Sequence, residues 1–152
     1  MAHLRARVSP ADREWAHRQL PAGAAGLFDA MPVADQRHGL DVARRLLAAS
    51  HDEPDLLAAA LLHDAAKGHR MRLWHRVAGV LLDAAAPGVL RRLASTEPDS
   101  WRYPFHLYLH HAELSADAAL AAGCTARTAA LIRGSAADGA ALAALRLADE
   151  SS

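Results

Sequence analysis

This 152-residue sequence is short of cysteine, of aromatic residues and of net charge, and each shortage excludes a class of protein. Cys124 is the single cysteine, which excludes an internal disulfide and a metal site built from several thiolates. Lys and Arg number 17 and Asp and Glu also number 17, so a formal net charge of +0 leaves no overall field to attract nucleic acid or an anionic membrane. We therefore expect no specific nucleic-acid partner.

Long apolar runs are also missing from this chain. No segment approaches the ~20 consecutive apolar residues needed to span a bilayer, and charged residues interrupt positions 1–20, where a secretory signal would need an apolar run. Together with the single cysteine, these features predict a cytoplasmic protein with no membrane partner, either a monomer or a homodimer.

Strand patterns are rare as well, because hardly any stretch alternates apolar and polar residues and aromatic residues make up only 5% of the chain. Ala, Leu and Arg, all good helix formers, dominate instead. The length suits one ordinary domain with a single core. We predict an all-α fold, a single compact bundle of about six to nine helices, in which residues 1–30 form a helical extension packed on a main domain of residues 31–152.

Capping residues, prolines and glycines divide the chain into expected helices. Ser9, Pro10 and Asp12 form a start signal that consists of a cap, a first-turn proline and an acidic third position. Residues 56–62 are apolar on every side, which is typical of a central helix surrounded by others. The expected helices cover residues 10–20, 25–30, 32–49, 53–68, 72–86, 87–93, 101–110, 115–122, 125–133 and 139–150.

Histidine is unusually frequent, with 10 residues, and it is the commonest neutral metal ligand in proteins. Four groups could bind one divalent cation at ~2.0–2.2 Å: His38, the adjacent pair His63 and Asp64, and Asp149. Neighbouring helical residues differ in direction by about 100°, so the pair would have to flank one cleft in which the cation lies. A structural hydrogen-bond network is the alternative interpretation of these four residues.

Basic residues follow the pair of His63 and Asp64. Lys67 comes three residues after Asp64, about one helical turn away, where its ammonium could bind a phosphate or form a salt bridge with the carboxylate. Trp74 lies among further basic residues, and this stretch could bind a polyphosphate and stack a base, or be a solvated helix face. The candidate substrate-binding residues are Lys67, Arg70, Arg72 and Arg76.

The order and context of the four candidate ligands resemble the HD-domain superfamily of metal-dependent phosphohydrolases. The resemblance rests on His38 in "RHGLDVARRL", His63-Asp64 in "ALLHDAAKG" and Asp149 in "ALRLADE", and it covers about residues 31–150. The segments "HDAAKG" and "HHAELSADAALAAG" are similar to those of compact bacterial members such as the symmetrical dinucleoside tetraphosphate hydrolases. The resemblance implies an HD-type helical bundle in which these four residues hold a first metal ion.

The resemblance also places His111 of "HHAEL" at a second, weaker metal site, for which the adjacent His110 is the less favoured ligand. His110 has an alternative role, since its i, i+4 spacing from His106 could chelate a metal by itself. Members of this type usually carry a further His after a segment like "ALIRG", where this chain has Gly134-Ser135-Ala136. We therefore expect one tightly bound divalent ion, whether Fe, Mn, Zn, Ni or Mg, and a second one weak or missing.

The activity implied is hydrolysis of a phosphate ester or anhydride in a nucleotide-like small molecule, with Asp64 and Lys67 as catalytic residues. Asp64 would accept a proton from a metal-bound water, and Lys67 would hold a phosphate. A first alternative is a degenerate HD domain that binds metal or nucleotide as a non-catalytic sensor. A second alternative is a mixed-valent di-iron oxygenase, against which the missing His counts.

Overall fold

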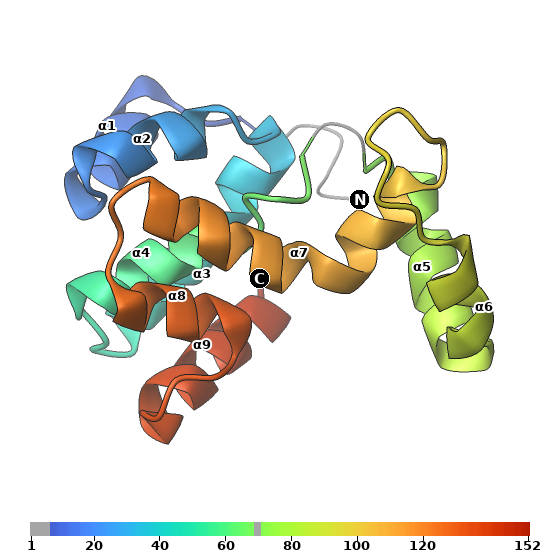
Figure 1. The fold of residues 1–152 in the computed structure, drawn as a ribbon. Helices are drawn as coiled ribbons and strands as arrows, with labels where there is room; N and C mark the ends of the chain where they lie inside the picture. Colours follow the sequence, from blue (N-terminus) through green and yellow to red (C-terminus); the bar gives the residue numbers. More distant parts are fainter. Residues whose placement is uncertain (1–6, 69–70) are drawn as a thin grey trace.

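The computed structural model describes residues 7–68 and 71–152, which form nine α-helices and no strand (Figure 1). This confirms the all-α prediction and the expected number of helices. Among the described helices, none combines the length and the apolar character needed to cross a bilayer. The helices are α1 (Pro10–Gln19), α2 (Ala22–Asp29), α3 (Val33–Ala48), α4 (Pro54–Leu62), α5 (Leu73–Ala85), α6 (Pro87–Leu93), α7 (Tyr103–Ala121), α8 (Ala126–Arg133) and α9 (Gly139–Glu150).

Helix α4 lies at the centre of the bundle, as its apolar sequence predicts. Every residue from Leu56 to Leu62 is buried, and the helix contacts α1, α2, α3, α7, α8 and α9. Full burial of one leucine side chain contributes about 1.5–3 kcal/mol. The leucines of α4 therefore anchor the core around which the other helices are arranged.

The two N-terminal helices belong to the same core. Ala16 of α1 and Ala24 and Phe28 of α2 are fully buried in the cluster that contains the leucines of α4. The expected start signal of α1 is confirmed as a capping box. The backbone N–H of Asp12 donates to Ser9 Oγ (3.1 Å), and the backbone N–H of Ser9 donates to Asp12 Oδ2 (3.2 Å).

Asp12 makes the stability of this end of the molecule dependent on pH. Hydrogen bonds from Arg44 and Ser9 hold the pKa of Asp12 at about 2, below its usual 3.8. The carboxylate therefore stabilises the fold fully above pH 3.8, and this contribution is lost as the pH falls through 2. We expect Asp12→Asn to lower the free energy of unfolding by about 1–2 kcal/mol at neutral pH. Urea unfolding at a series of pH values should show this deficit shrinking in acid; a deficit independent of pH would contradict the assignment.

The expected break after His110 is wrong, because α7 continues from Tyr103 to Ala121. The sequence places Ser115 at the start of a new helix, but this residue is buried within α7. Its hydroxyl accepts a hydrogen bond from the backbone N–H of Ala66 (3.0 Å). The intervening residues contain neither glycine nor proline, so no strong local signal ends the helix there.

The expected end of the fourth helix near Gly68 is also wrong. Helix α4 ends at Leu62, and residues 63–68 form turns in which the backbone N–H of Lys67 donates to the carbonyl oxygen of Asp64 (3.0 Å). Gly68 follows with a φ of 58°, a left-handed conformation that glycine adopts without strain. Asp64 and Lys67 are therefore positioned by a turn rather than by a helix.

Helices α5 and α6 lie at the edge of the bundle, where they contact each other and α7 (Figure 1). None of their described residues belongs to the main core cluster. Gly79 of α5 packs closely on α7, since a Cβ at this position would lie 2.8 Å from the ring of Tyr108. An ion pair from Arg76 to Asp35 (2.8 Å) joins α5 to α3.

Candidate metal centre

Four side chains that are up to 111 residues apart in the chain meet in one cluster: His38, His63, Asp64 and Asp149. His38 projects from α3, and Asp149 lies in the last turn of α9. His63 is the C-cap of α4, and Asp64 begins the following turn. Asp149 Oδ1 lies 2.8 Å from His38 Nε2 and 3.3 Å from His63 Nε2. His63 Nε2 lies 3.7 Å from Asp64 Oδ1.

The spacing of this cluster suits one divalent ion. Two ligands that each lie ~2.1 Å from an ion are at most about 4.2 Å apart, and the three contacts just given are all shorter. The ligand atoms of His38, His63 and Asp64 lie within 4.8 Å of one another. The Asp149 side chain is 45% exposed, so the cluster is reached from solvent on its side. The group of His38, His63 and Asp64 could therefore hold a metal ion, and Asp149 Oδ1 contacts both of its imidazoles.

Two buried atoms of the cluster lack a hydrogen-bond partner among the described residues: His63 Nε2 and Asp64 Oδ1. The other ring nitrogen of His63 is engaged, because Nδ1–H donates to the carbonyl oxygen of Ala60 (2.9 Å). This bond places a proton on Nδ1, so Nε2 is the ring nitrogen that faces the carboxylates of Asp64 and Asp149. Each atom lies beside a charged group, Asp149 for His63 Nε2 (3.3 Å) and Lys67 for Asp64 Oδ1 (2.6 Å). A cation bound by both atoms would give each a ligand bond in place of the missing hydrogen bond.

Contacts within the cluster decide its charges. Burial lowers the pKa of His63, but its contact with Asp149 and the charge of Asp64 outweigh burial and raise this pKa overall. Burial raises the pKa of Asp64, but the positive charges of His63 and Lys67 outweigh it, so this pKa falls below its usual value. The hydrogen bond with His38 and the contact with His63 lower the pKa of Asp149 as well. Both carboxylates are thus anionic at neutral pH, as metal ligands must be.

Lys67 reaches the cluster from the turn after α4. Its Nζ lies 2.6 Å from Asp64 Oδ1, in an ion pair. The Lys67 side chain is 22% exposed and the Asp64 side chain only 4%, so the cation lies between the buried carboxylate and solvent. The salt bridge that the spacing allows is therefore present, and phosphate binding by Lys67 stays a prediction.

A pocket of about 230 Å³ adjoins the cluster and includes His111 of α7. The Nδ1–H of His111 donates to the carbonyl oxygen of Tyr108 (3.0 Å), which leaves the lone pair on Nε2. Burial lowers the pKa of His111, so its imidazole is neutral at neutral pH. The adjacent His110 is exposed, and its ring packs on His106 with centroids 4.6 Å apart. The ionisable residues that line the pocket are His63, His111, Arg133, Arg146 and Asp149.

Sequence reasoning missed the two arginines of this pocket. Arg146 precedes Asp149 by three residues on α9, and this i, i+3 spacing was a signal that could have found it. Arg133 carries no comparable signal, since it reaches the pocket from α8 and pairs with Glu113 (3.2 Å) and Asp117 of α7. The pocket beside the metal cluster is therefore more basic than the sequence pattern indicates.

Two arginines of the basic stretch after Lys67, Arg72 and Arg76, make contacts outside the candidate metal cluster. The guanidinium of Arg76 makes two contacts with the buried carboxylate of Asp35, at 2.8 and 3.0 Å, and this pair was also missed from the sequence. Arg72 is exposed at the start of α5, where it lines a separate pocket with Trp74. Arg70 lies outside the described residues. Substrate binding by these arginines stays a prediction.

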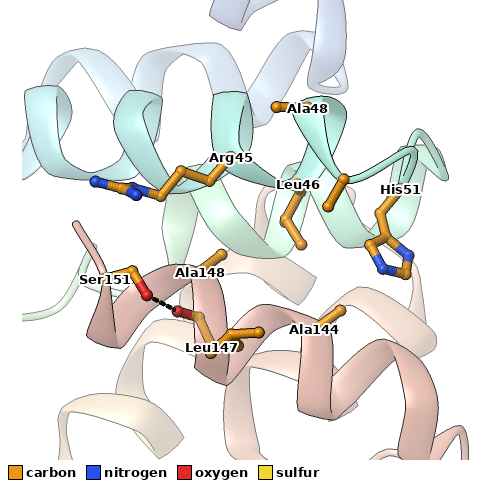
Figure 2. A pocket seen from close by; sticks show the side chains of 9 residues that line it. Arg45, Leu46, Ala48, His51, Ala144, Leu147, Ala148 and Ser151 are labelled. Carbon is orange, nitrogen blue, oxygen red and sulfur yellow. Dashed lines mark hydrogen bonds between the residues drawn. The ribbon is translucent and has the colours of Figure 1, made fainter.

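A larger pocket, of about 360 Å³, lies between α3 and α9 (Figure 2). Most of its described lining is apolar, with Arg45 and His51 as the ionisable side chains. The hydroxyl of Ser151 donates to the carbonyl oxygen of Leu147 (2.7 Å) at one edge. Because this lining offers no carboxylate and only one imidazole, the pocket is not an alternative metal site.

The chain has no match among known protein families, curated proteins or solved structures. Within residues 7–68 and 71–152, the group around His38, His63 and Asp64 is the one set of His, Cys, Asp and Glu side chains with the spacing to hold a metal ion. The functional argument therefore rests on the geometry and chemistry of this cluster.

Proposed function

We propose that this protein is a divalent-metal-dependent phosphohydrolase of the HD type, acting on a nucleotide-like phosphate ester or anhydride. The observation that carries the proposal is the meeting of His38, His63, Asp64 and Asp149 in one cluster. Two of its buried atoms, His63 Nε2 and Asp64 Oδ1, make no hydrogen bond within the described part of the chain and lie beside the charged groups of Asp149 and Lys67. Two imidazoles and two carboxylates suit Fe, Mn, Zn or Ni, and suit Mg less well because it prefers oxygen ligands. When bound, the ion would polarise a phosphoryl oxygen and lower the pKa of a bound water towards neutrality.

The protein's own groups would orient the reactants and move the proton. Asp64 is anionic and buried, so its carboxylate can accept a proton from the attacking water. Lys67 lies between this carboxylate and solvent, where its ammonium could bind a phosphate oxygen that enters from outside. His63 is held by the carbonyl oxygen of Ala60, so the orientation of its ring does not depend on the ion.

One tightly bound ion fits this site better than two. A second ion beside His111 would have one imidazole from α7, and Gly134-Ser135-Ala136 offers no further imidazole. Arg146 lines the same pocket, and its positive charge would repel a second cation while attracting a phosphate. The charge of Arg133 is offset by its ion pairs with Glu113 and Asp117. The incomplete second donor set also counts against the di-iron oxygenase alternative.

A non-catalytic sensor is the second candidate, and the ion pair between Lys67 and Asp64 favours it. An ammonium 2.6 Å from Asp64 Oδ1 competes with both a metal ion and a proton for this carboxylate. If Lys67 keeps this contact when a nucleotide binds, Asp64 cannot serve as a base, and the protein would bind its ligand without turnover.

A hydrolysis assay separates these two candidates. Protein loaded in turn with Fe, Mn, Zn, Ni or Mg is offered nucleoside monophosphates, diphosphates and triphosphates and dinucleoside polyphosphates, and the products are separated and quantified. We expect turnover that requires the metal, saturates with substrate and stops when EDTA is added. Saturable nucleotide binding without product would favour the sensor, and neither binding nor product with any ion would refute both candidates.

A further inference from the structure

The outer face of α5 carries an apolar stripe. At about 100° per residue, five of the described side chains fall within an arc of about 120° on one side of the helix: Trp74, Val77, Val80, Leu81 and Ala84. All five are exposed, with exposed fractions of 52% for Trp74, 52% for Val77, 56% for Val80 and 63% for Leu81. Amphipathic helices normally turn such a stripe towards a core. This stripe faces solvent instead.

The opposite side of α5 is the side that packs on the molecule. Gly79 lies so close to α7 that a Cβ there would be 2.8 Å from the ring of Tyr108. His75, on the same side, is buried against Phe105 of α7, with ring centroids 5.8 Å apart. Figure 1 shows α5 and α6 at the edge of the bundle. The stripe therefore points away from α7 except at Trp74, whose half-exposed ring also contacts Phe105 of α7, with ring centroids 6.2 Å apart. The described part of the chain leaves the other four side chains exposed.

We infer that this stripe is a dimer interface, occupied by the antiparallel α5 of a second copy of the chain. The stripe tapers, because its large residue, Trp74, is at one end and its small residue, Ala84, is at the other. In an antiparallel pair centred on position 79, Trp74 of one copy faces Ala84 of the other and Val77 faces Leu81, since each pair of numbers averages 79. The bulkiest side chain thus meets the smallest, two branched aliphatic side chains meet each other, and each contact occurs twice, as two-fold symmetry requires.

Charge and area agree with a second copy as the occupant. The stripe contains no charged residue and the formal net charge of the chain is +0, so two copies do not repel each other and an anionic membrane offers no attraction. The stripe exposes roughly 300–400 Å² of apolar surface per copy. Because interfaces are about 60% apolar, a dimer would bury roughly 1,000–1,300 Å² in total, at the lower end of specific interfaces. We expect a dissociation constant on the order of 10 μM.

Sedimentation equilibrium of the full chain, at concentrations from about 1 to 300 μM, tests this interface. Leu81→Glu should leave the protein monomeric throughout. Leu147→Glu is the matched control, because Leu147 on α9 is similarly exposed (67%) and lies outside the stripe; this variant should dimerise like the wild type. A monomeric wild type at the highest concentration, or equal loss in both variants, would overturn the proposal. So would binding of a monomeric wild type to phosphatidylcholine and phosphatidylserine vesicles.

A charge-pair experiment tests the antiparallel arrangement itself. Val77→Lys and Leu81→Glu should each be monomeric alone, because each brings an unpaired charge into the apolar contact twice. Mixed in equal amounts, the two variants should form a heterodimer in which one introduced ammonium faces one introduced carboxylate. Circular dichroism checks that both variants keep the helical content of the wild type. A mixture that stays monomeric although both variants are folded would overturn this arrangement.

Discussion

Replacement of His63 by Ala is expected to remove tight metal binding. Wild-type protein reconstituted with Mn or Fe should retain about one ion per chain, and His63→Ala should bind it at least ~100-fold more weakly. His63 Nε2 is the donor that joins the two carboxylates, since it lies 3.3 Å from Asp149 Oδ1 and 3.7 Å from Asp64 Oδ1. Without this imidazole, three candidate ligands remain. Asp64 is buried and separated from the other two, which are His38 and the half-exposed Asp149 in contact with each other.

Elemental analysis after desalting measures the bound ion, and thermal unfolding gives a second readout. A ligand present at 100 times its dissociation constant stabilises a protein by about 2.7 kcal/mol, and His63→Ala should lose this gain. His17→Ala is the control, because His17 pairs with Asp29 on the surface of the N-terminal helices (3.0 Å). Equal metal content in wild type and His63→Ala would contradict the assignment of the ligand. No metal in the wild type would remove the metal centre and the hydrolase proposal together.

Two equivalents of metal in the wild type would contradict the expectation of a single ion. His111 would then be the first residue to test, because its Nε2 carries the lone pair beside the cluster. Loss of one of the two equivalents in His111→Ala would show that another group replaces the missing imidazole at Gly134-Ser135-Ala136.

The position of a helix can be predicted from the sequence where residues close to one another in the chain determine its start or its burial. The cap and proline at Ser9 and Pro10 and the apolar run of residues 56–62 both act within a few residues, and both predictions are confirmed. The error at Ser115 has a different origin. Its hydroxyl is satisfied by the backbone of Ala66, which lies 49 residues earlier, and no local pattern reports a bond of that kind.

The sequence identifies which residues form the candidate site, but it does not predict which of them contact one another. The contact of His38 with Asp149 joins positions 111 residues apart, and periodicity alone gives no reason to pair them. Lys67 was expected near Asp64 from helical spacing, and turn hydrogen bonds keep it there although α4 ends earlier. The basic stretch after Lys67 is the reason that Arg76 is predicted to bind substrate. Its ion pair with Asp35 joins positions 41 residues apart, and no local pattern predicts it.

Gly39 links the fold to the proposed metal centre, and its replacement by Ala is expected to weaken both. A Cβ at Gly39 would lie 3.0 Å from the carbonyl oxygen of Leu61 and 3.2 Å from that of Ala60, both backbone atoms of α4. Backbone atoms in the middle of a bundle cannot rotate aside as a flexible side chain can, so α3 must move away from α4. His38 would move with α3, whereas His63 is held on α4 by the carbonyl oxygen of Ala60.

We expect Gly39→Ala to lower the free energy of unfolding by about 1–3 kcal/mol and to weaken metal binding by about tenfold. Gly26→Ala is the matched control, because a Cβ there would meet no atom within 4 Å, and it should stabilise α2 by about 0.5–1 kcal/mol. Urea unfolding and metal titration of the metal-free variants measure the two effects. Equal stability of the variants, or unchanged metal affinity in Gly39→Ala, would contradict the coupling. Both losses are expected together because one close approach of α3 to α4 also sets the 5.2 Å between the rings of His38 and His63.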